Sequence, residues 1–223
     1  MPEVKNICVK NKKTMESSKE KNHAYYRACG IRENWFYKTV KEFENDPEAK
    51  KMVQSYLQQL KDMVRKGIGL YLWGANGTGK SHLMHCTFKA LLHQRYTVKI
   101  LTLDELVDKF TASWYNEEVK ANFHRMLLTV QFLGIDEFGK NVGADGEPNY
   151  LPDLVKRVIE EVIRYRVHTK KPIWITSNTE PKNVASVFSE DVASLLSEAC
   201  VPVKVCGCDY RKIIQKRNKL LLK

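Results

Sequence analysis

The sequence predicts an α/β fold, a parallel sheet covered by helices on both faces. Two observations carry this prediction. A complete phosphate-loop pattern, G-x-x-x-x-G-K-[ST], spans residues 74–81, between an apolar run at 68–73 and a helical apolar stripe at 82–93. Further along, an apolar run at 130–137 ends in two consecutive acids. Apolar strands that alternate with helices are typical of parallel sheets, which bind their ligands beyond the carboxyl ends of the strands.

The spacing of apolar residues and helix breakers predicts the other elements in order. A helix over 47–65 begins after Asp46 and is stopped by Gly67 and Gly69. Downstream, Asp104 is expected to cap a helix, and Pro202 suits an edge strand. The remaining strands are expected at 97–103, 172–178 and 201–206. The remaining helices are expected at 104–110, 117–128, 151–167, 188–200 and from Asp209 onward, with a loop at 139–149.

The chain divides into three expected segments. Residues 1–22 are polar and lysine-rich without an apolar period, which predicts a flexible basic arm. Residues 23–66 combine an aromatic cluster with the leading helix. The aromatic side chains either form a strap across the next segment or stack on nucleobases, and we favour the strap. Residues 67–223 form the nucleotide-binding core.

The overall composition favours a polyanionic partner. The chain has 223 residues, a formal net charge of +11 and a pI of about 9.3. This balance makes nucleic acid the first candidate, and the alternative is a basic tail that only aids solubility. The six cysteines are scattered, and no signal peptide or apolar run of membrane length is evident. We therefore expect a cytoplasmic protein with reduced thiols and no membrane partner.

The phosphate loop is expected to bind ATP. Its glycines let the backbone curl, so that successive N–H groups face an anion at the positive end of a helix. Lys80 is placed to reach the β- and γ-phosphates, and the Ser81 hydroxyl can ligate Mg²⁺. A glycine turn with a stray lysine is the alternative, which the flanking strand and helix disfavour. The expected nucleotide contacts in this segment are Gly74, Ala75, Asn76, Gly77, Thr78, Gly79, Lys80, Ser81 and His82.

The polar ends of two other strands complete the expected site. Asp136 would hold Mg²⁺, directly or through water, and Glu137 would orient and activate the water that attacks the γ-phosphate. The alternative is a pair of surface acids at a strand end. Asn178 ends the 172–178 strand, where its amide can bond the γ-phosphate or the attacking water. A simple turn residue is the alternative for this position.

The order of these motifs resembles that of the AAA+ ATPases. The finer pattern is similar to the bacterial and phage helicase loaders of the DnaC/DnaI type and to the related IstB transposition ATPases. The likeness covers about residues 26–216 and rests on GI at 30–31, IDEFG at 135–139, ITSN at 175–178 and GCDYR at 207–211. It implies a three-layer P-loop NTPase core with a five-stranded parallel sheet and no large C-terminal helical lid. It also implies ATP-dependent self-assembly into a homo-oligomer and binding of single-stranded DNA.

The resemblance also assigns roles outside the phosphate loop. Asn178 would sense the γ-phosphate, and Arg211 would touch nucleotide phosphates. In relatives, the helix before the last strand usually carries an arginine that reaches a neighbouring subunit's ATP, but residues 188–198 contain none. Either another arginine replaces it, or the protein hydrolyses ATP poorly by itself. The possible replacements are Arg157, Arg164 and Arg166.

Three functions follow as hypotheses. The leading one is a helicase loader that delivers a replicative DNA helicase onto single-stranded DNA, with Mg-ATP binding and hydrolysis as the switch. The second is an IstB-like transposition helper that acts on duplex DNA. The third is a weakly hydrolysing regulator that sequesters a helicase, which the missing arginine favours. The candidate DNA contacts are the lysines of the basic arm and the helix faces near Lys120 and Arg125.

Overall fold

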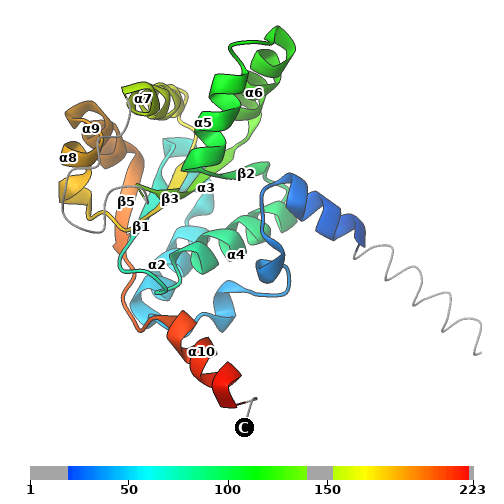
Figure 1. Cartoon of the computed structure of the whole chain (residues 1–223), viewed down its shortest axis with the longest axis vertical. Helices are drawn as coiled ribbons and strands as arrows, with labels where there is room; N and C mark the ends of the chain where they lie inside the picture. Colours follow the sequence, from blue (N-terminus) through cyan, green and yellow to red (C-terminus); the bar gives the residue numbers. More distant parts are fainter. Residues whose placement is uncertain (1–19, 140–152, 221–223) are drawn as a thin grey trace, which may run out of the picture.

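The computed structural model describes residues 20–139 and 153–220, and it confirms the predicted α/β architecture (Figure 1). Five parallel strands lie in the order β2-β3-β4-β1-β5. The strands are β1 (Gly69–Trp73), β2 (Val98–Thr102), β3 (Phe132–Phe138), β4 (Ile173–Ser177) and β5 (Cys200–Lys204). As predicted, Pro202 lies on an edge strand, where a missing N–H costs no ladder hydrogen bond.

Two layers of helices cover the sheet. On one face, α2 (Pro47–Gln58), α3 (Leu60–Lys66) and α4 (Lys80–His93) pack in one apolar cluster with β1, β2 and the Trp174 ring. The other face is covered by α5 (Leu103–Ala112), α6 (Glu117–Thr129), α7 (Asp153–His168), α8 (Val184–Val187) and α9 (Glu190–Ala199). All five residues of β4 are buried, because a parallel sheet between two helical layers has no solvated face.

The segment before α2 crosses α4 as a strap. Residues 20–28 form a helix, followed by the short 3₁₀ turns η1 (Glu33–Trp35) and η2 (Val40–Glu42). The Lys89 ammonium donates to the carbonyls of Trp35, at 2.9 Å, and Phe36, at 2.7 Å, and also to that of Lys38. Of the aromatic cluster, Tyr26 and Phe36 are buried in this contact, whereas Tyr25 and Tyr37 are exposed. We call residues 29–43 the strap from here on.

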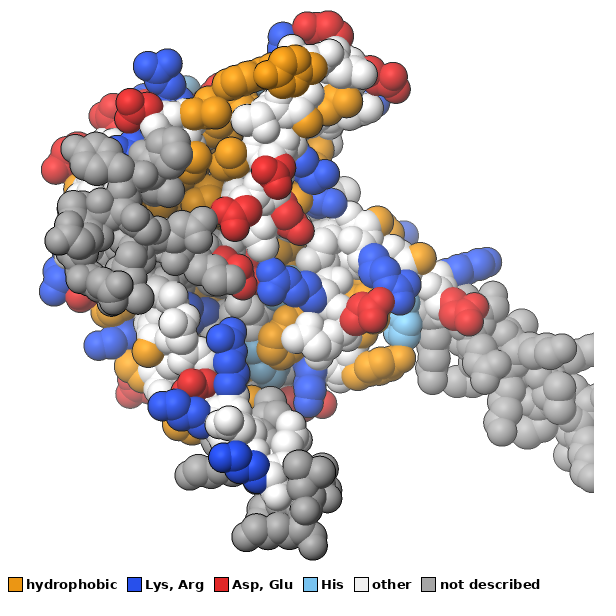
Figure 2. Space-filling view, in the orientation of Figure 1, with side chains coloured by type: hydrophobic (Ala, Val, Ile, Leu, Met, Phe, Trp, Pro, Cys, Tyr) orange, Lys and Arg blue, Asp and Glu red, His pale blue; other side chains and the backbone are white. Residues whose placement is uncertain are grey.

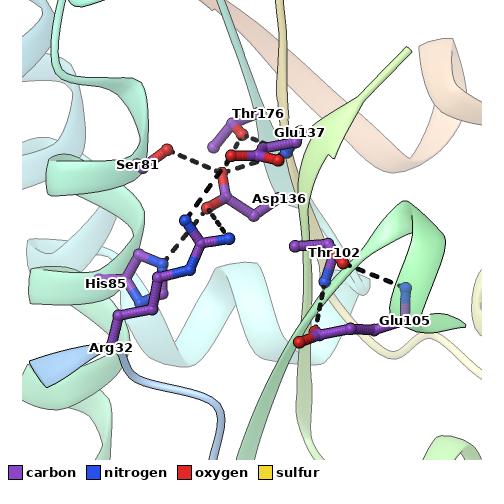
Figure 3. Close-up of polar contacts among 8 residues, drawn as sticks. All are labelled: Arg32, Ser81, His85, Thr102, Glu105, Asp136, Glu137 and Thr176. Atoms are coloured by element: carbon purple, nitrogen blue, oxygen red, sulfur yellow. Dashed lines mark hydrogen bonds and ion pairs between the residues drawn. The ribbon is translucent and has the colours of Figure 1, made fainter. Parts of the chain in front are cut away.

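Two local predictions are corrected. The helix expected over 47–65 is divided at Gln59, whose backbone leaves the helical region, into α2 and α3. Nothing in the surrounding contacts accounts for this break. The helix expected to begin at Asp104 also starts earlier. Thr102, and not Asp104, is the N-cap of α5. Thr102 and Glu105 form a capping box, with Glu105 N–H donating to Thr102 Oγ1 at 3.1 Å and Thr102 N–H donating to Glu105 Oε2 at 2.9 Å (Figure 3).

The periphery of the fold carries the remaining described elements. The α5–α6 pair projects from the sheet (Figure 1), and Figure 2 shows hydrophobic side chains, in orange, over its far end. Trp114, Tyr115 and Val119 of this pair are exposed. The turn η3 (Pro181–Asn183) precedes α8, and α10 (Tyr210–Leu220) follows β5. Within 20–139 and 153–220, no helix combines the length and the apolar character that a bilayer crossing requires. The expected basic arm, except for residues 20–22, and the expected loop from 140 onward lie outside the described residues.

Candidate nucleotide site

The phosphate loop joins β1 to α4 in a backbone conformation that needs its glycines. Gly77 and Gly79 have φ angles of +79° and +102°, in the left-handed region. A Cβ on Gly77 would lie 1.8 Å from Asp209 Oδ1, and one on Gly79 would lie 2.4 Å from the Phe43 ring. The loop is therefore enclosed by the end of the strap and by the residues that lead into α10.

Lys80, the first residue of α4, turns back over the loop. Its Nζ donates to Gly74 O at 2.8 Å and to Ala75 O at 2.7 Å. Burial lowers the pKa of Lys80 to about 8, Asp136 opposes that change and Arg211 adds to it. The ammonium thus occupies the loop as a group that can bind an anion, because a phosphate can replace the two backbone carbonyls that accept from it.

Asp136, at the carboxyl end of β3, is the most densely bonded acid of the site (Figure 3). Ser81 Oγ donates to its Oδ1 at 2.8 Å, Thr176 Oγ1 donates to the same oxygen, and His85 Nε2 lies 3.4 Å from Oδ2. Burial alone would raise the pKa of Asp136, but His85 and the two hydroxyls outweigh it and lower the pKa to about 2. The carboxylate is therefore charged at any physiological pH.

The donors around Asp136 fit a magnesium ion that is shared with a nucleotide. Ser81 Oγ and the Asp136 carboxylate are hard oxygen ligands, and Mg²⁺ is usually held by one or two such groups together with phosphates. The described residues contain no cluster of three or more His, Cys, Asp or Glu side chains that could hold a metal by themselves. The site therefore suits Mg²⁺ bound together with ATP and not an ion held in a cage of protein side chains.

Glu137 follows Asp136 in a backbone conformation that is rare for a residue with a side chain. Its φ is +61°, and its N–H donates to Thr176 Oγ1 at 3.1 Å and to Asp136 Oδ1 at 3.2 Å. Such strain of about 1–3 kcal/mol is retained where surrounding contacts hold it, often at functional sites. Here it turns the half-buried Glu137 carboxylate toward Arg32, whose Nη1 lies 3.6 Å from Glu137 Oε1.

Three further predicted residues lie around the loop. Asn178, just past β4, donates from Nδ2 to Asn76 Oδ1 at 3.0 Å, so its amide reaches the phosphate loop. The exposed Arg211 lies near enough to Lys80 to affect its pKa. His82 instead faces the strap, and its Nε2 lies 3.2 Å from Thr39 O. Its ring stacks on that of Trp35, with 4.9 Å between the ring centroids. Its contact with nucleotide stays a prediction.

A family model described as AFG1-like ATPase matches residues 31–222 of this sequence, which is most of the chain. The chain belongs to the AFG1-like ATPase family. The match includes the strap from residue 31 onward, the phosphate loop and the ends of β3 and β4, so the residues of the candidate site all lie within the matched range.

Individual relatives place this AFG1-like ATPase among proteins with the AAA+ fold. The replicative helicase loader DnaI of Bacillus subtilis (strain 168) is 26% identical over 147 residues, 65% of this chain and 45% of DnaI, so the match spans less than half of that relative. The crystal structure of the DnaC helicase loader gives a TM-score of 0.67 at 19% identity, with 78% of this chain and 100% of that chain covered.

A replication initiator gives a similar structural match. The structure of DnaA bound to AMPPCP and single-stranded DNA has a TM-score of 0.63 at 18% identity, and the match covers 85% of this chain and 56% of that chain. At these identities the likeness shows the fold alone. The predicted AAA+ architecture is confirmed.

Sequence reasoning missed three residues of the site in this AFG1-like ATPase. His85 had a usable signal, because it lies four residues after Ser81 on the same helix face. Thr176 had one as well, since it lies two residues before Asn178 and so on the same side of the strand end. Arg32 had none, because nothing local connects a strap residue with β3.

The three arginines proposed to replace the missing arginine of α9 lie on α7, and they differ in exposure. Arg166 is buried, and its guanidinium donates to the carbonyls of Leu127, Gln131 and Pro172 at 2.8–2.9 Å. It is therefore unavailable to a neighbouring subunit, and the prediction that it replaces the missing arginine is wrong. Arg164 is exposed and pairs with Glu160 at 2.6 Å. Arg157, also on α7, is exposed.

Proposed function

We propose that this AFG1-like ATPase binds Mg-ATP at residues 74–81 and hydrolyses it. The observation that carries the proposal is the convergence of Lys80, from the phosphate loop and the start of α4, with Asp136 and Glu137, from the end of β3, on one edge of the sheet. In such sites the protein contributes mainly positioning and electrostatic stabilisation of the transferred phosphoryl group.

The residues would divide the work as follows. Lys80 would exchange its two loop carbonyls for the β- and γ-phosphates, which gain a charge-assisted bond. Ser81 and Asp136 would hold Mg²⁺, which supplies charge neutralisation at the phosphates. Glu137 would accept a proton from the attacking water, and Asn178 and Arg211 would contact the phosphates from either side of the loop.

We further propose that the ATP state controls loading of a replicative DNA helicase onto single-stranded DNA. The support is the match to the helicase loader DnaI, the shared fold with DnaC and the net charge of +11. Self-assembly as a homo-oligomer belongs to the same proposal. Large aromatic residues exposed together at the far end of α5–α6, Trp114 and Tyr115, are typical of surfaces that contact another macromolecule.

One observation favours a second function, a slow ATPase that regulates a helicase. No arginine occurs in α9, and Arg166 is sealed in the interior. An arginine supplied to the phosphates of a neighbour is worth a factor of about 10³–10⁵ in rate, so turnover would be slow unless Arg157 or Arg164 takes this role.

Turnover of ATP tests these proposals, measured with and without single-stranded DNA and the replicative helicase of the same source. Glu137→Gln should retain ATP binding and lose about 10²-fold or more in turnover. Glu198→Gln, an exposed acid on α9, serves as the matched control and should behave as the parent. Unchanged turnover in Glu137→Gln would contradict the role assigned to this acid.

The partners separate the remaining possibilities. A helicase loader should deposit the helicase on single-stranded circles only with ATP, and its DNA affinity should fall steeply with salt if phosphates dominate the contact. Preference for duplex DNA would favour the transposition helper, and inhibition of the helicase without turnover would favour the regulator. Lys120→Gln and Arg125→Gln on α6 test the described candidate contacts, of which Lys120 also pairs with Glu117 at 3.5 Å.

A further inference from the structure

An arginine from the strap lies against both acids of the site. Arg32 Nη1 is 3.6 Å from Glu137 Oε1, and Nη2 is 3.9 Å from Asp136 Oδ2 (Figure 3). The Asp136 side chain is almost fully buried, whereas 46% of the Arg32 side chain is exposed. Arg32 therefore reaches from the molecular surface to the acid that is expected to hold Mg²⁺.

The backbone on both sides of Arg32 is held in place. The Ile100 N–H of β2 donates to Cys29 O at 2.8 Å, and a Cβ on Gly30 would lie only 2.0 Å from Ile100 O. Beyond Arg32, Lys89 binds the carbonyls of Trp35 and Phe36. The strap thus presents this arginine from a fixed position, which lowers the entropy cost of its ion pairs.

The charges make Arg32 a competitor of a metal ion. A guanidinium beside Asp136 and Glu137 stabilises the two carboxylates while no divalent cation is present. The same positive charge repels Mg²⁺ from these oxygens, and it attracts the negative phosphates of a nucleotide that arrives without metal. An exposed arginine that did not contact these acids would affect neither the binding of Mg²⁺ nor the binding of a metal-free nucleotide.

We propose that Arg32 is a counter-ion carried by the strap, which neutralises the metal-site acids in the nucleotide-free protein and competes with Mg²⁺ for them. The inference rests on the proposed Mg-ATP site and adds a control on metal binding to it. Because coupling between two binding events is reciprocal, Mg²⁺ at Asp136 weakens the hold of the acids on Arg32 and hence on the strap.

Removal of the Arg32 charge should change two affinities in opposite directions, whereas loss of a purely structural contact would not. Arg32→Gln should tighten binding of a divalent cation, because one repelling charge is removed. It should weaken binding of ATP in EDTA, because one attracting charge is lost. We expect each affinity to change by about tenfold, the size that one unit charge has at a partly exposed site.

The experiment measures two dissociation constants on the full chain. Binding of Mn²⁺ alone, which is expected to be weak because the protein supplies only Ser81 and Asp136 as ligands, is followed by electron paramagnetic resonance at millimolar metal. Binding of ATP in EDTA is followed by calorimetry. Arg32→Lys keeps the charge and should stay close to the parent in both. Arg65→Gln is the matched control, because it also removes one positive charge and an exposed ion pair, with Asp62 at 3.0 Å on α3, and both constants should stay unchanged.

Opposite shifts in Arg32→Gln, with parent-like values in Arg32→Lys, would support the inference. Unchanged Mn²⁺ affinity, or weakening of both ligands together, would overturn it. Failure of the parent chain to bind ATP under any condition would contradict the proposed function instead, and the Mn²⁺ titration would still decide the role of Arg32.

Discussion

On the α7 face of the sheet, the buried guanidinium of Arg166 donates to the carbonyls of Gln131 and Pro172, where β3 and β4 begin. On the α4 face, the ammonium of Lys89 donates to the strap carbonyls of Trp35 and Phe36. Both cations donate to backbone carbonyls, of which Pro172 O also accepts from Leu133 N–H at 3.3 Å and Trp35 O also accepts from Lys38 N–H at 3.2 Å.

The difference lies in what each cation holds. The partners of Arg166 lie at the end of α6 and at the amino ends of β3 and β4, away from the phosphate loop, so this arginine stabilises the fold without contacting the site. The partners of Lys89 belong to the strap that carries Arg32 to the acids. The same chemistry therefore supports the core on one face and positions a functional segment on the other.

The largest effect is expected from Arg166→Met. The free energy of unfolding should fall by about 3–5 kcal/mol, because several buried carbonyls lose their only charged donor. Denaturant titration measures the loss, and ATP affinity of the folded protein should remain that of the parent. A loss below about 1 kcal/mol would show that water or a local shift replaces the guanidinium, and the contrast between the faces would fail.

Lys89→Met should lower the free energy of unfolding by about 2 kcal/mol, since the strap carbonyls lose their charged donor at a less enclosed place. Unlike Arg166→Met, Lys89→Met should release the strap. Proteolysis between residues 29 and 43 should then be faster, and Mn²⁺ should bind more tightly because Arg32 moves away from the acids. Parent-like proteolysis together with parent-like Mn²⁺ binding would show that the strap is held by its apolar contacts and that Lys89 contributes only stability.

Lys80 is the other lysine of α4 that donates to backbone carbonyls, and the pH dependence of ATP binding tests its role. Because the pKa of Lys80 is lowered to about 8, the free protein loses this positive charge as pH rises above that value. ATP binds the protonated form better, so its affinity should fall above about pH 8 by up to tenfold per pH unit. Calorimetry at several pH values checks this, and Lys80→Arg, which stays charged, should remove the dependence.

The smallest effect is expected from an exposed pair on α7. Glu160→Gln leaves Arg164 without its partner at 2.6 Å, yet both side chains are in contact with water. The free energy of unfolding should stay that of the parent within the error of the measurement. A denaturant midpoint clearly below that of the parent would mean that the exposed and the buried arginine of this helix both contribute to stability.

The sequence was informative wherever the signal is local. The residues of 74–81 sit next to each other in the chain, and their types follow from backbone curvature and anion binding. The two acids were placed because a parallel sheet gathers its strand ends at one edge. The break at Gln59 and the cap at Thr102 were missed, because apolar periodicity continues through the first and Asp104 competes for the second.

By itself, the sequence determined the α/β class and the order of the strands along the chain, and it predicted the residues that are expected to bind phosphate and metal. Those properties depend on residues close together in the chain. Only the tertiary structure decided that Thr176 and His85 bond Asp136, that Arg166 is sealed in the interior and that Arg32 faces both acids. Contacts between residues so distant in sequence depend on how the layers and the strap pack, and a single sequence carries no local signal for them.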